Sequence, residues 1–508
     1  MSELRSEETF REERQDEAPA TRLGIRALAQ DAAIYGGTRV LLKSLAFLLV
    51  PLYAHFLAPA QFGVLELVLA TVAIVDVFIS ANVDGVFARF YYDQDRPAWR
   101  RQIITLYLLI ETVYPAIVIG FLIAFSNPVS ERIFSTEQYA SFLVIALVDL
   151  FLTNIVDLPM ILCRVRRKPY TFATYSLIRG LIQIVFSVLL VAVWHYGVKG
   201  ILVASLISVC VGFVVTLREY VRDLTRHVDL RVGLEMVHFA WPGIIGGLAF
   251  YGLNLGDRFI LKAYHGLDAN GLYGTAFRYS QVVLVGVLAF RLGWTQWHYS
   301  WLNTDRHPRM VARGALYFFF GAGFLAVLVS AWIAPLFHVL MPERYWPALP
   351  AVAPLAIAGV ATGAYSLFTV GLAVSKRMRL IPLLALCGSA VALGFYFLLI
   401  PPYSFKGAAW ATAIGMWAMA LFVYVVSNRI YPVPWHWVRN SLAIGLMVAL
   451  CLASLAVDRW IPDAPSLPLR LAILLAYPVG LAVLGFFPPG DLGAARHAAG
   501  RVLRLRRA

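Results

Sequence analysis

Long apolar segments recur along almost the whole of this 508-residue chain, and they constrain its fold more than any other feature. A helix needs about 20 apolar residues to cross the hydrocarbon core of a bilayer. Residues 103–125 have that length and do not alternate polar with apolar residues, as a strand of a membrane barrel would. We therefore predict an all-α integral membrane protein. Candidate spans cover residues 34–57, 62–88, 102–125, 140–162, 171–194, 200–217, 239–263, 271–297, 311–334, 350–374, 380–400, 407–427, 441–457 and 469–487.

Composition agrees with a chain that lies mostly in lipid. Hydrophobic residues make up 60% of the sequence and charged residues 14%, whereas a soluble domain carries about 25% charged residues. The last two of the fourteen spans are short and flanked by prolines. Twelve spans plus one re-entrant hairpin is therefore the alternative count.

Lysine and arginine are distributed unevenly between the loops. One set of alternate loops, which includes 164–168 and 376–379, holds about four times as many as the other set. The positive-inside rule then predicts that both termini are cytoplasmic and that the chain is a multi-pass protein of a bacterial inner membrane. The net charge of +14 belongs to this anchoring, so we expect no nucleic-acid partner.

The ends of the chain and one inner loop complete the expected organisation. Residues 1–30 mix Glu and Arg without an apolar core, so we expect a disordered cytoplasmic segment and not a signal peptide. We expect residues 488–508 to form a basic cytoplasmic tail. In the loop 218–238, Val221, Leu224, Val228 and Val232 recur at helical spacing, which predicts an amphipathic linker helix on the inner leaflet.

This linker divides the chain into similar halves. Residues 31–217 would form an N-terminal lobe of six spans, residues 239–427 a C-terminal lobe of six, and residues 428–487 two further spans. Gly63 and Gly271 follow the first long helix of each half and lie 208 residues apart. Because each half begins inside, the sequence favours parallel repeats about an axis along the membrane normal.

Two hairpins carry a family resemblance. The segment Leu57-Ala-Pro-Ala-Gln-Phe-Gly63 resembles the opening of the polysaccharide repeat-unit flippases, such as those for O-antigen or exopolysaccharide. The segments Asn254-Leu-Gly-Asp257-Arg258-Phe259 and Asn270-Gly-Leu-Tyr-Gly274 resemble the seventh and eighth helices of that family. The family belongs to the multidrug, oligosaccharidyl-lipid and polysaccharide exporter superfamily, which also holds the lipid II flippases and the multidrug and toxin extrusion antiporters.

The resemblance implies both a fold and a function. The fold would be two six-helix lobes around a central cavity, with two peripheral C-terminal helices. The function would be to move undecaprenyl-pyrophosphate-linked oligosaccharide repeat units to the periplasmic leaflet by alternating access. Proteins of lipopolysaccharide or exopolysaccharide assembly, such as a polymerase, would then be partners.

Basic residues at membrane depth are candidates for binding the pyrophosphate. An ionised side chain at the centre of a membrane helix costs a few kcal/mol, so it normally faces a cavity or a partner. Arginine also presents a planar fork of donors that matches phosphate oxygens. The candidates are Arg39, Lys43, Arg179, Arg258 and Arg278.

Acidic residues at the same depth are slightly more numerous, so some are expected to neutralise these cations. They are Glu66, Asp76, Asp84, Glu111, Asp149, Asp157 and Asp257. Asp76, Glu111 and Asp149 are our candidates for ion coupling, and Asp76 is the first of them because it lies in mid-helix.

The sequence contains no motif for nucleotide, metal or nucleophile chemistry. A phosphate-binding G-x-x-x-x-G-K-[ST] and a zinc-protease H-E-x-x-H are both absent, and the four cysteines show no close pair. We therefore expect no catalytic residue, no metal and no cofactor, and a transporter that is not an enzyme. A cation-coupled drug antiporter stays open, as does a membrane polymerase or ligase, although short periplasmic loops disfavour the latter.

Overall fold

The computed structural model describes residues 34–487 except 39, 43, 46, 81–82, 222, 303 and 461–465. This described part contains helices and no strand. The first half holds Ile34–Phe56, α2 (Pro59–Ser80), α3 (Val83–Tyr91), α4 (Pro97–Ala124), α5 (Ser126–Phe134), α6 (Ala140–Val165), α7 (Pro169–Ser187) and α8 (Gly197–Thr216). The second holds α9 (Arg218–Val221), α10 (Leu230–Ala240), α11 (Pro242–Tyr299), α12 (His307–Leu340), α13 (Leu349–Phe368), α14 (Val370–Val374), α15 (Ile381–Ile430), α16 (Trp437–Trp460) and α17 (Ser466–Val483).

The two longest helices are hairpins. In α11 the backbone turns at Gly266, with φ of 78°, and in α15 at Ser404, with φ of 53°. Residues 16 apart in a straight helix lie about 24 Å apart. Yet the hydroxyl of Tyr273 donates a hydrogen bond to Asp257, so the chain folds back between them.

The described helices have the length and hydropathy that a membrane requires. Eleven are long and apolar enough to cross it, and the two hairpin helices are among them. The apolar helix Leu467–Val483 is shorter. The prediction of an all-α membrane fold is therefore confirmed, and the total of fourteen spans stays a prediction.

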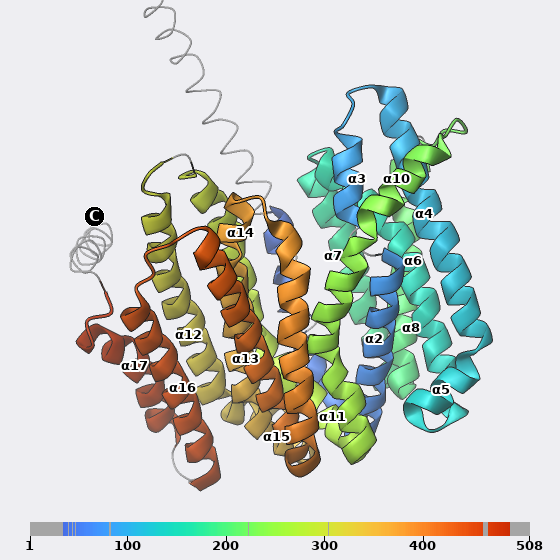
Figure 1. Cartoon of the computed structure of the whole chain (residues 1–508). Helices are drawn as coiled ribbons and strands as arrows, with labels where there is room; N and C mark the ends of the chain where they lie inside the picture. The colour runs from blue at the N-terminus through green and yellow to red at the C-terminus, as the bar shows by residue number, and fades with distance from the viewer. Residues whose placement is uncertain are drawn as a thin grey trace, which may run out of the picture.

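The helices form two groups, which meet in the middle of the molecule (Figure 1). In the first group α6 packs against α4 and α8, and α8 against α7. In the second group α11, α13 and α15 pack against one another. Contacts between α2 and α11 are the main junction between the groups.

Glycines allow α2 and α11 to approach each other closely. A Cβ added to Gly63 would overlap the carbonyl oxygen of Leu267, and one added to Gly271 would overlap that of Pro59. Asn270 donates a hydrogen bond from Nδ2 to the carbonyl of Gly63, at 3.1 Å. The two glycines that mark the repeat in the sequence therefore face each other across the junction of the halves.

The two C-terminal helices are fixed to α12 by buried polar groups. Arg470 of α17 forms an ion pair with Asp458 of α16 and donates to the carbonyl of Ala331 at 2.7 Å. The hydroxyl of Tyr477 donates to the carbonyl of Phe319 at 3.0 Å. Helices α16 and α17 thus pack onto the second group of helices.

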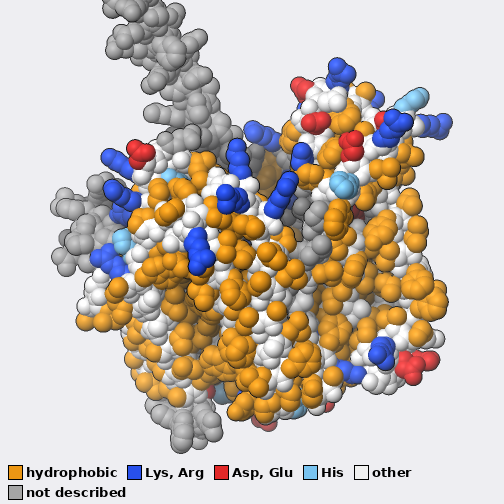
Figure 2. All heavy atoms as spheres, in the orientation of Figure 1, with side chains coloured by type: hydrophobic (Ala, Val, Ile, Leu, Met, Phe, Trp, Pro, Cys, Tyr) orange, Lys and Arg blue, Asp and Glu red, His pale blue; other side chains and the backbone are white. Residues whose placement is uncertain are grey.

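One end of the bundle is rich in cations. Figure 2 shows Lys and Arg side chains gathered at one end, above a broad apolar surface. We call this the basic end; its turns include Arg166, Lys168 and Lys376. The turns at Ser135, His195, Gly266 and Ser404 lie at the opposite end, which we call the outer end.

The structure has two short helices in place of the single expected linker helix, and the amphipathic cytoplasmic linker over 218–238 stays a prediction. Helix α9 ends at Val221, and α10 begins at Leu230, where Asp229 caps it by accepting from the backbone N–H of Arg231 at 2.9 Å. Val228 and Val232 pack against the apolar cluster of α3, α4 and α6. These two valines therefore contact the protein rather than the membrane surface, so this part of the loop does not form a free surface helix.

A pair of buried histidines closes the basic end of the second group. His298 is 4% exposed and lies seven residues beyond the apolar span that ends at Arg291. Its ring lies 5.8 Å from that of His307, whose Nδ1 is hydrogen-bonded to the hydroxyl of Tyr431 at 2.6 Å. Burial, and the charge of His307, lower the pKa of His298 to about 4.

This pKa predicts a loss of stability in acid. The unfolded imidazole takes up a proton near pH 6.5, whereas the folded one resists protonation until about pH 4. Stability at neutral pH should therefore fall as the pH drops through that interval, at about 1.4 kcal/mol per unit. Thermal unfolding in detergent should show a weaker pH dependence for His298→Asn than for wild type. The exposed His436→Gln is the control, and an equal slope for all three proteins would contradict the assignment.

The close contact at Gly63 predicts that a methyl group there lowers the stability of the protein. Gly63→Ala should lower the melting temperature, because its new methyl group meets the backbone of α11, and overpacking of this kind costs about 1–3 kcal/mol. Gly256→Ala is the matched control, since open space surrounds that position and alanine favours a helix. Equal melting temperatures for the two variants would refute the close packing of α2 on α11.

Candidate functional site

A cavity of about 500 Å³ lies among the helices of the first half. The helix Ile34–Phe56 contributes Leu42, Leu45, Leu49 and Tyr53, which recur at helical spacing on one face. Helices α2, α6, α7 and α8 form the other walls, and Arg278 of α11 is the contribution of the second half. The cavity therefore lies beside the junction of the two halves.

Charged side chains follow one face of α6 along this cavity. Asp149, Asp157, Met160 and Arg164 all line it and lie on the same side of the helix. Fifteen residues separate Asp149 from Arg164, which corresponds to about 22 Å of helix. Arg164 lies next to the last residue of α6, at the basic end. The cavity thus extends from mid-helix towards the basic end.

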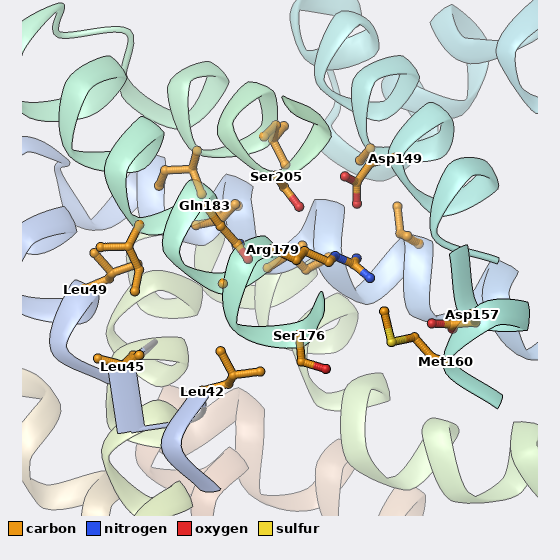
Figure 3. A pocket seen from close by; sticks show the side chains of 18 of the residues that line it. Leu42, Leu45, Leu49, Asp149, Asp157, Met160, Ser176, Arg179, Gln183 and Ser205 are labelled. Carbon is orange, nitrogen blue, oxygen red and sulfur yellow. The ribbon is translucent and has the colours of Figure 1, made fainter. Parts of the chain in front are cut away.

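Arg179 of α7 crosses the cavity. Figure 3 shows its guanidinium pointing into the space between Asp149 and Asp157. Its Nη2 donates to the hydroxyl of Thr153 at 3.1 Å, and its charge acts on Asp149, which also interacts with Ser205. Its backbone carbonyl accepts from Ser208 of α8 at 2.7 Å, which fixes the height of α7. Arg179 is therefore held in place while its guanidinium faces the cavity.

Arg278 lies at the wall formed by the second half. Its side chain is 28% exposed, and its Nη2 lies 2.7 Å from Oε1 of Glu66 on α2. The ring of Phe62 lies 5.2 Å from its guanidinium carbon. Arg278 also lines a smaller hollow beside Ser44 and Gln281, so it is reached from two sides.

The structure separates Arg258 from this cavity. Arg258 is 2% exposed and its guanidinium is bonded to Glu66 and Asp257, at 3.2 and 3.1 Å. Arg39 and Lys43 lie outside the described residues. The structure therefore brings together Arg179 and Arg278 from the predicted set.

Arg164 is a lining residue that sequence reasoning missed. It was counted among the loop cations, because it follows the apolar part of its span. The sequence does contain one sign that Arg164 lines the cavity: it lies seven residues from Asp157, so both side chains share one helix face.

A second, more acidic cavity of about 300 Å³ adjoins the first. It is lined by Asp76, Ser80, Tyr107, Glu111, Leu150, Thr153, Asn154 and Asp157. The hydroxyl of Ser80 donates to Asp76 at 2.8 Å. Of the predicted coupling residues, Asp76 and Glu111 share this cavity, whereas Asp149 lines the larger one. Asp157 lines both, so the two cavities have a common wall.

Among the described residues, no group of three or more His, Cys, Asp or Glu is placed to hold a metal ion. The four cysteines are free thiols.

Polar contacts join the halves at the outer end. Arg344 donates to the backbone carbonyls of Ala54 and His55, at 2.8 and 2.7 Å. The hydroxyl of Tyr345 donates to the carbonyl of Leu57 at 2.9 Å, and Lys262 donates to Ser135 at 2.7 Å. With the glycine contact, these bonds close the molecule on the side away from the basic end.

The fold and the cavity together define a class of protein. Two groups of membrane helices that are joined at the outer end, with a charged cavity in the first group, define a multi-pass membrane protein. The chain is similar to a lipid II flippase, MurJ, in an inward closed conformation, with a TM-score of 0.69 and 10% identity over 89% of this chain and 98% of the flippase.

Two MATE transporters share this fold. One is an inward-facing multidrug resistance MATE family transporter of the MOP superfamily, with a TM-score of 0.63 and 12% identity over 76% of this chain and 94% of the transporter. The other is the Vibrio cholerae MATE transporter VcmN in the bent form, with a TM-score of 0.50 and 16% identity over 82% of this chain and 99% of the transporter. These likenesses establish the fold.

Sequence comparison identifies the family. Residues 28–291 match the family described as polysaccharide biosynthesis protein, and no curated protein matches the chain. The chain belongs to this polysaccharide biosynthesis family, because the matched residues make up more than half of the chain. The resemblance seen in the two hairpins is confirmed.

The contacts of Arg179 predict energetic coupling with Asp149. Arg179→Gln should destabilise the protein, because it leaves Asp149 without the nearby cation, and Asp149→Asn should recover part of the loss. We expect a coupling free energy of about 1 kcal/mol in a double-mutant cycle of thermal unfolding. The control cycle combines Arg179→Gln with the distant Asp458→Asn, and the changes in unfolding free energy should add in that cycle. Additivity in both cycles would show that the two cavity charges do not interact.

Proposed function

We propose that this protein is a flippase for undecaprenyl-pyrophosphate-linked oligosaccharide repeat units, used in O-antigen or exopolysaccharide biosynthesis. The observation that carries the proposal is the cavity lined by Arg164, Arg179 and Arg278 in a chain of the polysaccharide biosynthesis family. The solved structure with the same fold that is titled a lipid II flippase supports a lipid-linked substrate. The family and fold support transport rather than catalysis.

The charge of the cavity fits an anionic head group. Its described lining holds three arginines against the two carboxylates Asp149 and Asp157. Arg164 and Arg179 come from different helices, so a pyrophosphate between them can accept from several donors at once. Arginine forks match phosphate oxygens in geometry, which lysine does not. Separate contacts of this kind favour binding of moderate strength, which a transporter needs for release.

The direction of transport follows from the placement of the basic end. We assign the basic end and both termini to the cytoplasm of a bacterial inner membrane, from the positive-inside rule. A lipid pyrophosphate carries about two negative charges, and an interior-negative potential favours their outward movement by about 2.3 kcal/mol per charge per 100 mV. That energy biases export without nucleotide hydrolysis.

Alternating access would use the two halves as moving bodies. We propose residues 31–217 and 239–427 as the two lobes, with 428–487 carried on the second. The outer-end contacts at Gly63 and Gly271 are closed in the structure, which fits a state that loads cargo from the basic end. A polymerase or another assembly protein would receive the exported unit.

The acidic cavity supports a second candidate function. Asp76 and Glu111 lie in it beside Asp157, so a cation-coupled antiporter of the same superfamily would have carboxylates available. In either function we propose Asp76, Glu111 and Asp149 as the residues that exchange an ion. The two candidates differ in the charge of the cargo.

Reconstituted protein tests the proposal. In proteoliposomes loaded with a polyprenyl-pyrophosphate-linked oligosaccharide, transport should accelerate when the loading side is made electrically negative at fixed pH. Arg179→Gln should slow it at least tenfold, because a cationic contact to the head group is lost. Movement is measured by access of a glycan-modifying enzyme to the far leaflet.

The control variant is Arg429→Gln, which removes an exposed arginine at the end of α15 and should leave the rate unchanged. A rate that ignores the potential, follows an imposed proton or sodium gradient and is lost in Asp76→Asn would favour the antiporter. Absence of glycan movement with active efflux of an organic cation would overturn the flippase.

A further inference from the structure

Glu66 is bonded to two arginines at once. Its Oε2 lies 3.2 Å from Nε of Arg258, and its Oε1 lies 2.7 Å from Nη2 and 2.8 Å from Nε of Arg278. Arg258 also pairs with Asp257 through Nη1, at 3.1 Å. Two cations and two carboxylates therefore form a cluster without net charge. The guanidinium of Arg258 packs over the ring of Phe277 at 4.6 Å.

This cluster crosses the junction between the halves. Glu66 belongs to α2, whereas Arg258 and Arg278 belong to the two arms of the α11 hairpin. Tyr273 and Thr412 hold the other carboxylate, Asp257, from the same side of the junction. Glu66 is thus the carboxylate of the first half in a cluster that otherwise belongs to the second half.

Helical spacing places the cluster directly beside the glycine contact. On α2, Pro59, Gly63 and Glu66 recur at intervals of four and three residues, so they share one face. On α11, Leu267, Gly271, Gly274 and Arg278 follow the same spacing. A Cβ on Gly274 would meet the side chain of Glu66. The ion pairs therefore lie one turn inward from the point where the outer end is closed.

Exposure differs sharply within the cluster. The side chains of Glu66, Arg258 and Asp257 are at most 6% exposed, whereas that of Arg278 is 28% exposed and lines the main cavity. A ligand in the cavity can reach Arg278 while the other three charges stay covered. Arg278 consequently faces two anions: Glu66 behind it and any anion bound in front of it.

We propose that the ion pairs of Glu66 with Arg258 and Arg278 hold the outer end closed, and that an anionic head group in the cavity opens it by replacing Glu66 on Arg278. We call these ion pairs the lock. The α2 helix cannot separate from α11 at Gly63 and Gly271 without parting Glu66 from both arginines. Because a buried carboxylate without its partner is strongly unfavourable, the outer end stays closed when the cavity is empty. A pyrophosphate on Arg278 supplies the missing counter-charge for that arginine and leaves Glu66 with one ion pair instead of two. The identity of the anion rests on the proposed function; the lock itself rests on the ion pairs.

Distance measurement between labels at the outer end tests this inference. Spin labels are attached to Glu137→Cys in the first half and Tyr403→Cys in the second, both at exposed positions, after the exposed Cys210 and Cys387 are replaced by Ser. Wild type in lipid nanodiscs should give mainly a short distance. Glu66→Gln should raise the population of longer distances at least threefold without ligand. Undecaprenyl pyrophosphate should raise it in wild type, and uncharged undecaprenol should not.

Asp458→Asn is the matched control. It breaks an ion pair with Arg470 that lies wholly within the second half, so it should leave the distances unchanged. If Glu66→Gln does not fold, Gly274→Ala replaces it, because that methyl group displaces the Glu66 side chain while all four charges stay. Wild-type distances in the folded Glu66→Gln variant, or in Gly274→Ala, would overturn the lock.

The outcomes separate the lock from the proposed function. If Glu66→Gln opens the outer end while undecaprenyl pyrophosphate leaves wild type closed, the ion-pair lock is supported and pyrophosphate as the displacing anion is overturned. If wild type moves lipid-linked glycan while Glu66→Gln keeps wild-type distances, the lock is wrong and the flippase stands.

Discussion

The ion pairs of Glu66 with Arg258 and Arg278 join α2 to α11 in the interior of a membrane protein, where little water can solvate Glu66 and Arg258. Each charge is tolerated there because its partner lies within hydrogen-bonding distance. The same bonds fix the distance between the two halves. The cavity of the first half borders on Arg278, so the shape of the cavity depends on this junction.

Small residues make the junction possible. Gly63 and Gly271 let the backbones of α2 and α11 approach until a methyl group would no longer fit between them. In lipid, helices associate through such packing and through polar contacts rather than through the hydrophobic effect. Close packing and ion pairing therefore act together at one place, and an outward movement of either half has to release both.

The two cavities of the first half place opposite charges close together. Arg179 bonds to Thr153, which lines the acidic cavity, and Asp157 belongs to both cavities. A change of charge on one side of this wall acts on the other side at short range and low dielectric. The binding of an anion near Arg179 and protonation among the carboxylates, both of which we propose, would thus be linked by geometry.

The sequence alone determined the membrane class and the positions of most helices, including the breaks between 239–263 and 271–297 and between 380–400 and 407–427, because apolar length is a local property. It also found Arg179 and Arg278, since a charge in an apolar span is conspicuous. It could not tell that Arg258 is enclosed by carboxylates or that Arg164 lines the cavity, and it extended the linker helix across residues that fold against α3 and α4. Only the tertiary structure decided these points, because the partner of a buried charge lies on another helix: Glu66 and Arg258 are 192 residues apart in the chain and 3.2 Å apart in space.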